Sequence, residues 1–542
     1  MATDTEPGRV EDFGQVSRTA GTVFRYLLLG ATMFGIVTLA VLLVYVANDA
    51  IRPLTADLGW HLTFFLTLVV PTAVVGGYLA RRNVPALKLG GMVVGMLAVS
   101  LMFSGGVAIV FVDIIPPLTG LSYVIGLIVP AALVVVLTKY EQQIPFTLRV
   151  AVTGAVFLLS LVGVPGYYHS IPEIVRQLPV VPADWVILTL VLGGVTAVVV
   201  SQYVARIRED TTAGLAAGAS AFVLTGLAAV VGPTVGVNAN AAAVVTSVAF
   251  VPTVAYAGGA AVTRERERIG LVLAGVVIGG SLVGAAAVDA LGFAGPQSWV
   301  DWQFLTSAHS GTAENAGLYP AIGGSILLMA TVAALSFPLG VGAAVYLEEY
   351  APDNAFTRFV DVNISNLAGV PSVVYGLLGL GVFVTYLGQP TGTVIIGGAT
   401  LALLILPIVI ISSREAIRAV PGDMRQASYG MGATRWQTVK NVVLPEAFPG
   451  ILTGTILALG RAIGETAPLI MIGAPNVLFT LPTELSSKVS AMPLQVYAWS
   501  SLFASEDFYT KAVPAGVVVL LAVLLAMNSV AIVLRNKFES GN

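Results

Sequence analysis

The sequence predicts an all-α integral membrane protein with about 14 transmembrane helices. Of its 542 residues, 56% are hydrophobic and only 10% are charged. A soluble protein of this length needs far more charge to cover its surface. The apolar residues come in blocks of about 20, the length that crosses a hydrocarbon core of about 30 Å. The 58 glycines fit this interpretation, because small residues let membrane helices approach closely.

The predicted spans follow the apolar blocks along the chain. The first block is too long for the core of a signal peptide and is interpreted as a retained span. Nine spans are expected in the first part, at 24–47, 61–80, 89–111, 116–138, 147–164, 185–204, 213–232, 241–262 and 269–291. Five more are expected at 320–343, 373–388, 394–413, 448–472 and 512–534.

The charges of the loops predict the orientation. With the N-terminus in the cytoplasm, ten basic residues of the first nine spans' loops lie inside, and only Arg52 and Arg176 lie outside. This is the bias of short cytoplasmic loops. Continued alternation places 414–447 inside and 473–511 outside. A multi-pass protein of the cytoplasmic membrane with both termini cytoplasmic is therefore expected.

Composition excludes several classes of function. The net charge of −3 gives no sign of nucleic-acid binding, and the absence of cysteine excludes disulfides and Cys-ligated zinc. His61, His169 and His309 show no metal-ligand spacing, so no metal site is predicted. Arginine outnumbers lysine by 20 to 6 and the loops are rich in acids, which favours a prokaryotic source adapted to salt, such as a halophilic archaeon.

One long loop has the pattern of a rigid handle. Between 414 and 445, Pro421 favours the start of a short helix, and glycines at 430 and 432 interrupt it. A second helical run is expected from Thr434 until Pro445 stops it. The alternative is an amphipathic helix that merely lies on the lipid surface. The chain has no GxxxxGK[ST] phosphate loop and no Gly-Lys pair, so any ATPase must be a separate polypeptide.

This loop resembles the EAA loop of ABC-importer permeases, through which such permeases couple to their ATPases. The spacing of that motif is kept, with Gln426 in place of the usual acid and Ser428 in place of the second alanine. The resemblance implies that coupling to an ATPase is carried by Gln426, Ala427, Ser428, Gly432, Ala433, Arg435, Leu444 and Pro445.

Four further strings resemble the PstA family of phosphate-importer permeases. They begin at Gly317, Pro338, Asn363 and Gly460, and the resemblance covers roughly 266–542. It implies a six-helix ABC type-1 (MetI-like) permease core at about 320–534, which transports rather than catalyses. It also implies a PstC-like permease partner, two PstB-like ATPases that hold the ATP and Mg, a PstS-like binding protein and membrane lipid. No cofactor is expected on this chain.

A break in character at the charged run 263–268 suggests two parts. Residues 1–262 are predicted to be a multi-span membrane extension of unknown role, and 263–542 the PstA-like permease.

Arg461 and Glu465 are the main candidates for a substrate pathway. They lie one helical turn apart near the middle of the span expected at 448–472, where each charge costs about 2.5–3.5 kcal/mol and usually serves a pathway. Arg461 can meet phosphate through two hydrogen bonds, and Glu465 can hold it in place. The alternative is an ion pair that only locks helices together. The resemblance places the family's transport residues at these two positions, with Thr466 beside them.

Secondary candidates are neutral donors, for which helix capping is the alternative role: Asn363, Asn366, Ser372 and Tyr375.

The predicted function is the permease subunit of an ATP-driven importer of inorganic phosphate. A permease for another oxyanion, such as sulfate or molybdate, stays open, since an arginine in a pathway does not choose among them. A membrane enzyme or sensor built on the N-terminal spans is a further alternative. The lack of His, Asp or Glu clusters within those spans argues against it.

Overall fold

The computed structural model describes residues 18–139, 145–164, 167–178, 183–503 and 505–539. This part of the chain forms 24 α-helices, two isolated β-bridges and no strand. The all-α membrane fold is thus confirmed. Residues 1–17 and 540–542 lie outside the described residues, so the side of the membrane on which the termini lie stays a prediction.

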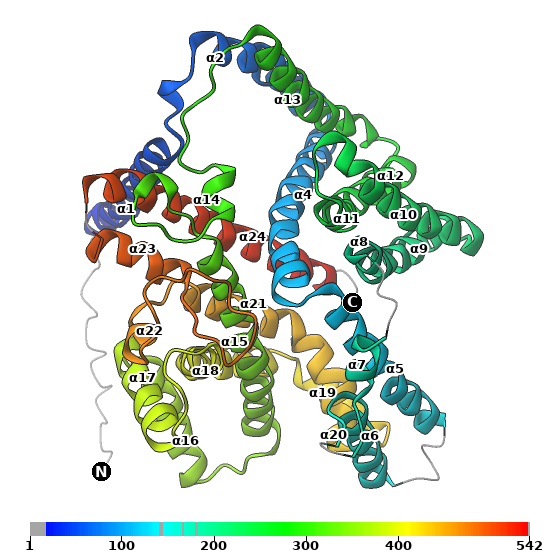
Figure 1. Cartoon of the computed structure of the whole chain (residues 1–542). Coiled ribbons are helices and arrows are strands. Elements are labelled where there is room, and N and C mark those ends of the chain that lie inside the picture. Colours follow the sequence, from blue (N-terminus) through cyan, green and yellow to red (C-terminus); the bar gives the residue numbers. More distant parts are fainter. Residues whose placement is uncertain (1–17, 140–144, 165–166, 179–182, 504, 540–542) are drawn as a thin grey trace, which may run out of the picture.

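The first thirteen helices belong to the N-terminal part of the chain (Figure 1). They are α1 Arg18–Ile51, α2 Leu58–Phe64, α3 Val70–Arg82, α4 Val84–Ala108, α5 Pro117–Lys139, α6 Phe146–Leu161, α7 Ile171–Arg176, α8 Asp184–Leu188, α9 Gly194–Arg208, α10 Thr211–Val231, α11 Ala239–Val245, α12 Val251–Thr263 and α13 Leu271–Leu291.

The remaining eleven form the C-terminal part. They are α14 Trp302–Thr306, α15 Tyr319–Val345, α16 Ala355–Ala368, α17 Ser372–Gly379, α18 Val394–Arg418, α19 Gly422–Gly430, α20 Arg435–Thr438, α21 Leu444–Ala462, α22 Ala467–Met471, α23 Met492–Ser501 and α24 Val513–Glu539.

Several spans contain a short π-helical segment that ends two residues before a proline. The segments Phe65–Val69, Thr246–Phe250, Val439–Val443 and Phe508–Ala512 precede Pro71, Pro252, Pro445 and Pro514. A proline lacks the N–H for an α-helical bond and its ring clashes with the carbonyl four residues before it. A π turn takes up this mismatch without ending the helix. These prolines therefore lie inside continuous spans.

Twelve helices among the described residues are long and apolar enough to cross a membrane. The pair formed by α16 and Ser372–Tyr386, bent by 107°, passes the same test only when its two helices are taken together. The span expected at 147–164 is the shorter apolar helix α6. The 14 predicted spans therefore correspond to the twelve, to the second helix of the bent pair (expected at 373–388) and to α6.

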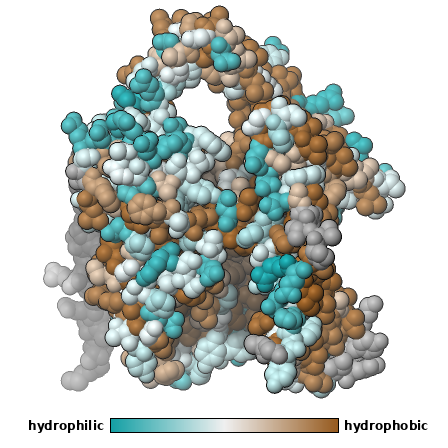
Figure 2. Space-filling model, in the orientation of Figure 1, coloured by the Kyte–Doolittle hydropathy of each residue, from teal (hydrophilic) through white to brown (hydrophobic). Residues whose placement is uncertain are grey.

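Glycines set the packing of the N-terminal part. A Cβ at Gly270 would strike the backbone of Ala86, and one at Gly280 would strike the backbone of Thr67, so α13 runs against α4 and the α2–α3 span at backbone contact distance. Gly214 approaches the Ser201 carbonyl in the same way, which joins α10 to α9. Such crossings by small residues are typical of membrane helices. Figure 2 shows the broad hydrophobic surface that the N-terminal part presents over α9, α10 and α12.

Residues 52–298 form a long insertion between α1, which packs on the C-terminal part, and Trp299, where the chain rejoins that part. α1 packs along α24. The two connecting segments are hydrogen-bonded to each other: the Trp299 amide donates to the Ala50 carbonyl (2.8 Å) and the Asp57 amide to the Ala294 carbonyl (3.0 Å). Beyond them, α2 and α13 form the arch at the top of Figure 1.

The predicted boundary at residue 263 therefore falls between α13 and the helices on which it packs. α4 adds a further link to the core, because it lies against α24, and Asp113 just beyond it accepts a hydrogen bond from the Tyr319 hydroxyl (2.5 Å).

The C-terminal part has a core of interdigitated apolar side chains. Helices α15, α18 and α21 pack side by side, and α24 lies against α21. Their shared core includes Leu328, Leu401 and Ile405, each almost fully buried. The two ends of this bundle differ. At one end, which we call the elbow end, lie α16, α19 and α20. At the other, the far end, the loop after α22 and helix α23 cover the start of α15, where the Met492 amide donates to the Ser325 hydroxyl (2.9 Å).

Candidate functional site

The segment after α18 forms the predicted elbow of two short helices. Helix α19 begins directly after Pro421 and ends at Gly430. Gly432 has φ +83°, a left-handed conformation that favours glycine, and it turns the chain. Thr434 starts α20 with a capping box. The Thr434 hydroxyl accepts from the backbone amide of Gln437, and the Gln437 side-chain oxygen accepts from the backbone amide of Thr434. The predicted roles of Pro421, Gly432 and Thr434 are confirmed.

The predicted stop at Pro445 is wrong. The chain is helical from Arg435 to Ala462 without interruption. Pro445 lies inside this continuous helix, and the π segment Val439–Val443 just before it takes up the missing N–H and the bulk of the proline ring. The second helix of the elbow is therefore the first part of the following span, so a push on α20 acts directly on α21.

The residues that match the EAA motif divide into buried and exposed sets. The Ser428 and Thr438 hydroxyls share a buried hydrogen bond (2.8 Å) that ties α19 to the helix after it. Val443 and Ala447 pack under the elbow against Ile417. Gln426, Ala427, Gly432, Arg435 and Pro445 are exposed, whereas Ala433 and Leu444 are partly buried. Met431 and Trp436 beside them are 84% and 57% exposed. The elbow thus combines a fixed inner side with an outer side free to meet a partner.

A cluster of charged side chains ties the end of α18, from which the elbow starts, to the neighbouring helices, and sequence analysis missed it. The Arg414 guanidinium bonds to Glu348 (Nε–Oε1 2.8 Å) and, through two nitrogens, to Asp361 (2.5 and 3.3 Å). Arg418 reaches the same Glu348 oxygen (2.6 Å). We call Arg414, Arg418, Glu348 and Asp361 the elbow clamp. It joins the end of α18 to the end of α15 and to α16.

Two more arginines of the elbow extend these contacts. Arg425 in α19 forms an ion pair with the buried Glu349 (3.2 Å) and donates to the Ile417 carbonyl (2.7 Å). The Arg435 guanidinium lies over the Tyr350 ring, 5.2 Å from its centre. The signal in the sequence was the Glu348-Glu349 pair at the end of one apolar block and two arginines four apart at the end of another. Their pairing depends on packing that no spacing rule supplies.

Arg461 and Glu465 form an ion pair, with Arg461 Nε 3.5 Å from Glu465 Oε1. The position differs from the prediction, because α21 ends at Ala462 and α22 starts only at Ala467. The pair therefore lies across a break between two helices, not in the middle of one straight span. The Arg461 side chain is 44% exposed and that of Glu465 is 17% exposed. Thr466 lies in the same break, directly before α22.

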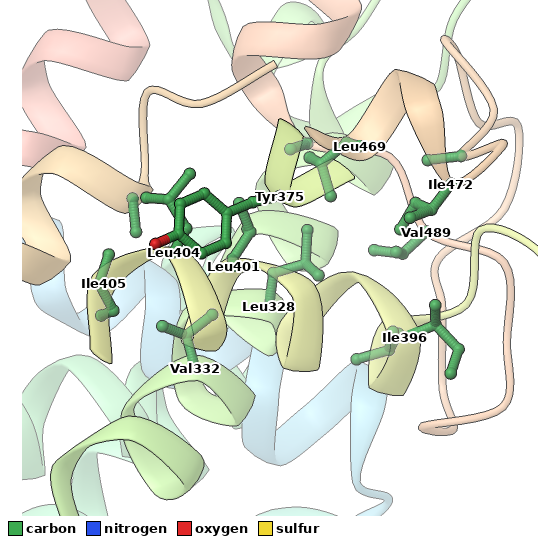
Figure 3. Close-up of a cluster of buried hydrophobic side chains, with 14 of the residues drawn as sticks. Leu328, Val332, Tyr375, Ile396, Leu401, Leu404, Ile405, Leu469, Ile472 and Val489 are labelled. Carbon is green, nitrogen blue, oxygen red and sulfur yellow. The ribbon is translucent and has the colours of Figure 1, made fainter. Parts of the chain in front are cut away.

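Tyr375 lies on α17. Its ring is buried in the apolar core with Leu401, Leu404 and Leu469 (Figure 3). The hydroxyl donates to the Leu367 carbonyl at the end of α16 (2.8 Å). Gly376 lies so close to Pro468 and Met471 that a Cβ there would clash. Helix α17 thus packs on α22, which begins two residues after Glu465, and forms one wall beside the Arg461–Glu465 pair.

The other secondary candidates lie apart from this wall. Asn363 and Asn366 are exposed on α16, and the Asn363 amide donates to the Phe359 carbonyl of its own helix (2.7 Å). Ser372 is the first residue of α17 and is partly buried. Among the described residues, no group of three or more His, Cys, Asp or Glu side chains could hold a metal ion.

Comparison with known proteins places this arrangement in a family. Residues 336–540 match the family described as binding-protein-dependent transport system inner membrane component. A phosphate transport system permease protein PstA from Yersinia pestis is 32% identical over 225 residues, which cover 41% of this chain and 73% of that protein. The chain belongs to this family of transport permeases. The match includes the elbow, the clamp arginines and the Arg461–Glu465 pair.

Other relatives also match part of the chain. The probable ABC transporter permease protein YqgI of Bacillus subtilis is 40% identical over 187 residues, which cover 34% of this chain and 63% of that protein. A phosphate transport system permease protein PstC of Mesorhizobium japonicum is 28% identical over 298 residues, covering 50% and 87%. The chain spans about three fifths of the length of the first relatives, 63% and 59%. An inward-facing structure of the MetNI methionine ABC transporter has a TM-score of 0.34 at 16% identity, covering 41% of this chain and 97% of that one.

Proposed function

We propose that this chain is the permease subunit of an ATP-driven ABC importer that carries inorganic phosphate across the cytoplasmic membrane. The observation that carries the proposal is the continuous helix Arg435–Ala462. Its first part is the exposed elbow and its last turn holds Arg461. A push on the elbow therefore acts on the helix that carries the charged pair. The names of the relatives, which include phosphate permeases, support phosphate as the substrate.

The chemistry of the pair suits a transient anion site. A guanidinium offers two parallel N–H donors to a phosphate oxygen pair. In the resting state Glu465 balances the charge of Arg461, and at 3.5 Å the pair is loose enough to exchange for a substrate oxyanion. Thr466 in the same break supplies a hydroxyl. The freed backbone of the break lines the pathway, where irregular structure is tolerated in a membrane.

The partners follow from what one chain supplies. ABC transporters work with two ATPases, whereas this chain has one elbow and no phosphate loop. We therefore expect a second, PstC-like permease, two PstB-like ATPases that bind ATP and Mg, and a PstS-like binding protein at the far end. Gln426, Ala427, Met431 and Trp436 would form the surface that meets the ATPase. No cofactor is proposed for this chain.

Uptake of labelled phosphate by a strain that lacks the chain tests this proposal. Wild-type protein is expected to restore uptake at low phosphate, with no competition by sulfate or molybdate. Arg461→Lys keeps the positive charge but loses the two parallel N–H donors of the guanidinium, and should lower uptake strongly. The matched control is Arg358→Lys on exposed α16, which should leave uptake unchanged. Uptake unchanged by loss of the chain, or stronger competition by sulfate than by phosphate, would reject phosphate as the substrate.

Gly432→Asp tests the elbow. We expect it to abolish uptake while the protein stays in the membrane, since it adds a charge to the outer side and a side chain at φ +83°. Gly432→Asn has the same shape without charge and tolerates the left-handed conformation, so it should retain more uptake. Wild-type uptake with Gly432→Asp would mean that the loop does not couple to an ATPase.

A further inference from the structure

Helix α16 lies against α18 at the edge of the C-terminal part. None of its residues is buried. A groove of about 400 Å³ separates it from the end of α15, lined among others by Tyr346, Leu347, Val360 and Ile364. Because an open groove forfeits dispersion contacts, the position of α16 depends strongly on its polar bonds.

A two-bond ion pair between Asp361 and Arg414 joins α16 to the end of α18, where the chain enters the elbow. Both oxygens of Asp361 accept from Arg414, which lies in the last turns of α18 and is only 15% exposed. The third contact of Arg414, to Glu348, fixes the guanidinium in its plane. A bidentate pair of this kind is directional, and its partial burial strengthens it. Asp361 is therefore held in one geometry relative to α18.

Helix α16 passes this constraint on to α17. The two helices meet at a bend of 107°, and the bond from the Tyr375 hydroxyl to the Leu367 carbonyl spans that bend. On its other side α17 lies against Pro468 and Met471 in α22 through Gly376. A path of bonded and packed groups thus runs from Arg414 to the wall beside Arg461.

We infer that Asp361 and Arg414 are a positioning pair that makes α16 and α17 move with the elbow. The pair links motion of the elbow to the wall of the Arg461 region, separately from the direct route along α21. This inference rests on the proposed function of the elbow. It predicts that a transporter without the Asp361–Arg414 pair still hydrolyses ATP but no longer moves α17.

The first test compares substitutions of Asp361 in the complete transporter in vesicles. Asp361→Asn should lower phosphate uptake per ATP hydrolysed by about tenfold, within the range of typical coupling free energies. Asp361→Glu keeps the charge and should restore most of the ratio. The matched control is Asp353→Asn, which removes a carboxylate from an exposed pair with Arg358 (3.9 Å) just before α16. A purely structural role would lower uptake and hydrolysis together, and that result, or an unchanged ratio, would overturn the inference.

The second test measures movement without any substrate. The chain has no cysteine, so spin labels can be placed at Leu54, Tyr386 and Met431, which are 84–87% exposed. In the wild type, trapping with ATP should change the 54–386 and the 54–431 distances. With Asp361→Asn, the 54–431 change should remain and the 54–386 change should disappear. A 54–386 change that persists would refute the pair while leaving the proposed phosphate function intact. Conversely, absence of phosphate transport by the wild type would refute that function and leave this distance test valid.

Discussion

The N-terminal and C-terminal parts of this protein both use close glycine crossings, but the C-terminal part adds a larger buried core and ion pairs between its helices. In the N-terminal part, glycines bring backbones together, as at Gly270 on Ala86 and Gly280 on Thr67. In the C-terminal part, large side chains such as Trp499 and Leu401 interdigitate, and arginines such as Arg414 tie helix ends together. Backbone crossings leave no room for adjustment, whereas ion pairs can break and re-form. The C-terminal part therefore has, beside fixed crossings, contacts that can exchange partners.

The largest effect, on the yield of folded protein, is expected from two deletions that remove different stretches of the N-terminal part. Removing 1–262 takes α1 from α24 and leaves α13 without the helices that it packs on, so we expect loss of folded protein. Removing 53–296 instead joins the chain beside the hydrogen bond from Trp299 to Ala50 and keeps α1 on α24, but it removes α4 from α24, so we expect folded protein in reduced yield. Yield in the membrane and monodispersity in detergent measure the outcome. A stable product from the first deletion and none from the second would mean that the boundary at residue 263 is the physical one.

Truncation of Trp499 probes the side-chain packing of the C-terminal part. It is fully buried at the far end of the bundle, and its indole N–H donates to His309 Nδ1 (3.0 Å). Trp499→Ala should lower the free energy of unfolding by about 3–5 kcal/mol, the usual cost of removing a buried aromatic side chain. Thermal or denaturant unfolding in detergent measures it. Trp302→Ala, at a position that is 79% exposed, is the control and should have little effect.

Addition of one methyl group probes the N-terminal packing. Gly270→Ala would push a Cβ into the Ala86 backbone, and we expect a loss of about 1–3 kcal/mol. Gly275→Ala in α13, which begins directly after Gly270, adds a Cβ where no atom lies within 4 Å, and should be neutral or slightly stabilising. Equal effects of the two substitutions on unfolding would contradict a scaffold held by close backbone crossings.

The smallest effect is a dependence of stability on pH at the far end. Burial lowers the pKa of His309 below its ordinary value of 6.5, so the folded protein keeps the ring neutral. The unfolded chain binds a proton more readily, and the contribution of His309 is therefore fully present above pH 6.5 and decreases as the pH falls below it. The melting temperature followed from pH 7.5 to about 5 should show this decline. His309→Gln keeps an acceptor for Trp499 and should flatten it; an unchanged slope would assign the decline to other groups.

Several local features were predictable from the sequence because they depend on neighbours along the chain. The apolar blocks revealed the spans, and Pro421, Gly432 and Thr434 determined the start, turn and restart of the elbow, since each acts on its own backbone. The Arg461–Glu465 pair was predictable from its spacing of four. The family was visible in short strings of residues, as the match over 336–540 confirms.

Other features were decided only by the tertiary structure. Pro445 continues a helix because a π turn precedes it, and propensity alone predicts a stop. The elbow clamp joins Arg414 to residues 53 and 66 positions away, and no local pattern specifies such pairing. The return of Trp299 to Ala50 brings together residues far apart in sequence, which shows where the long insertion begins and ends. Local preferences of neighbouring residues thus determined which helices form. The packing of side chains far apart in the sequence determined which of these helices are joined by ion pairs and hydrogen bonds.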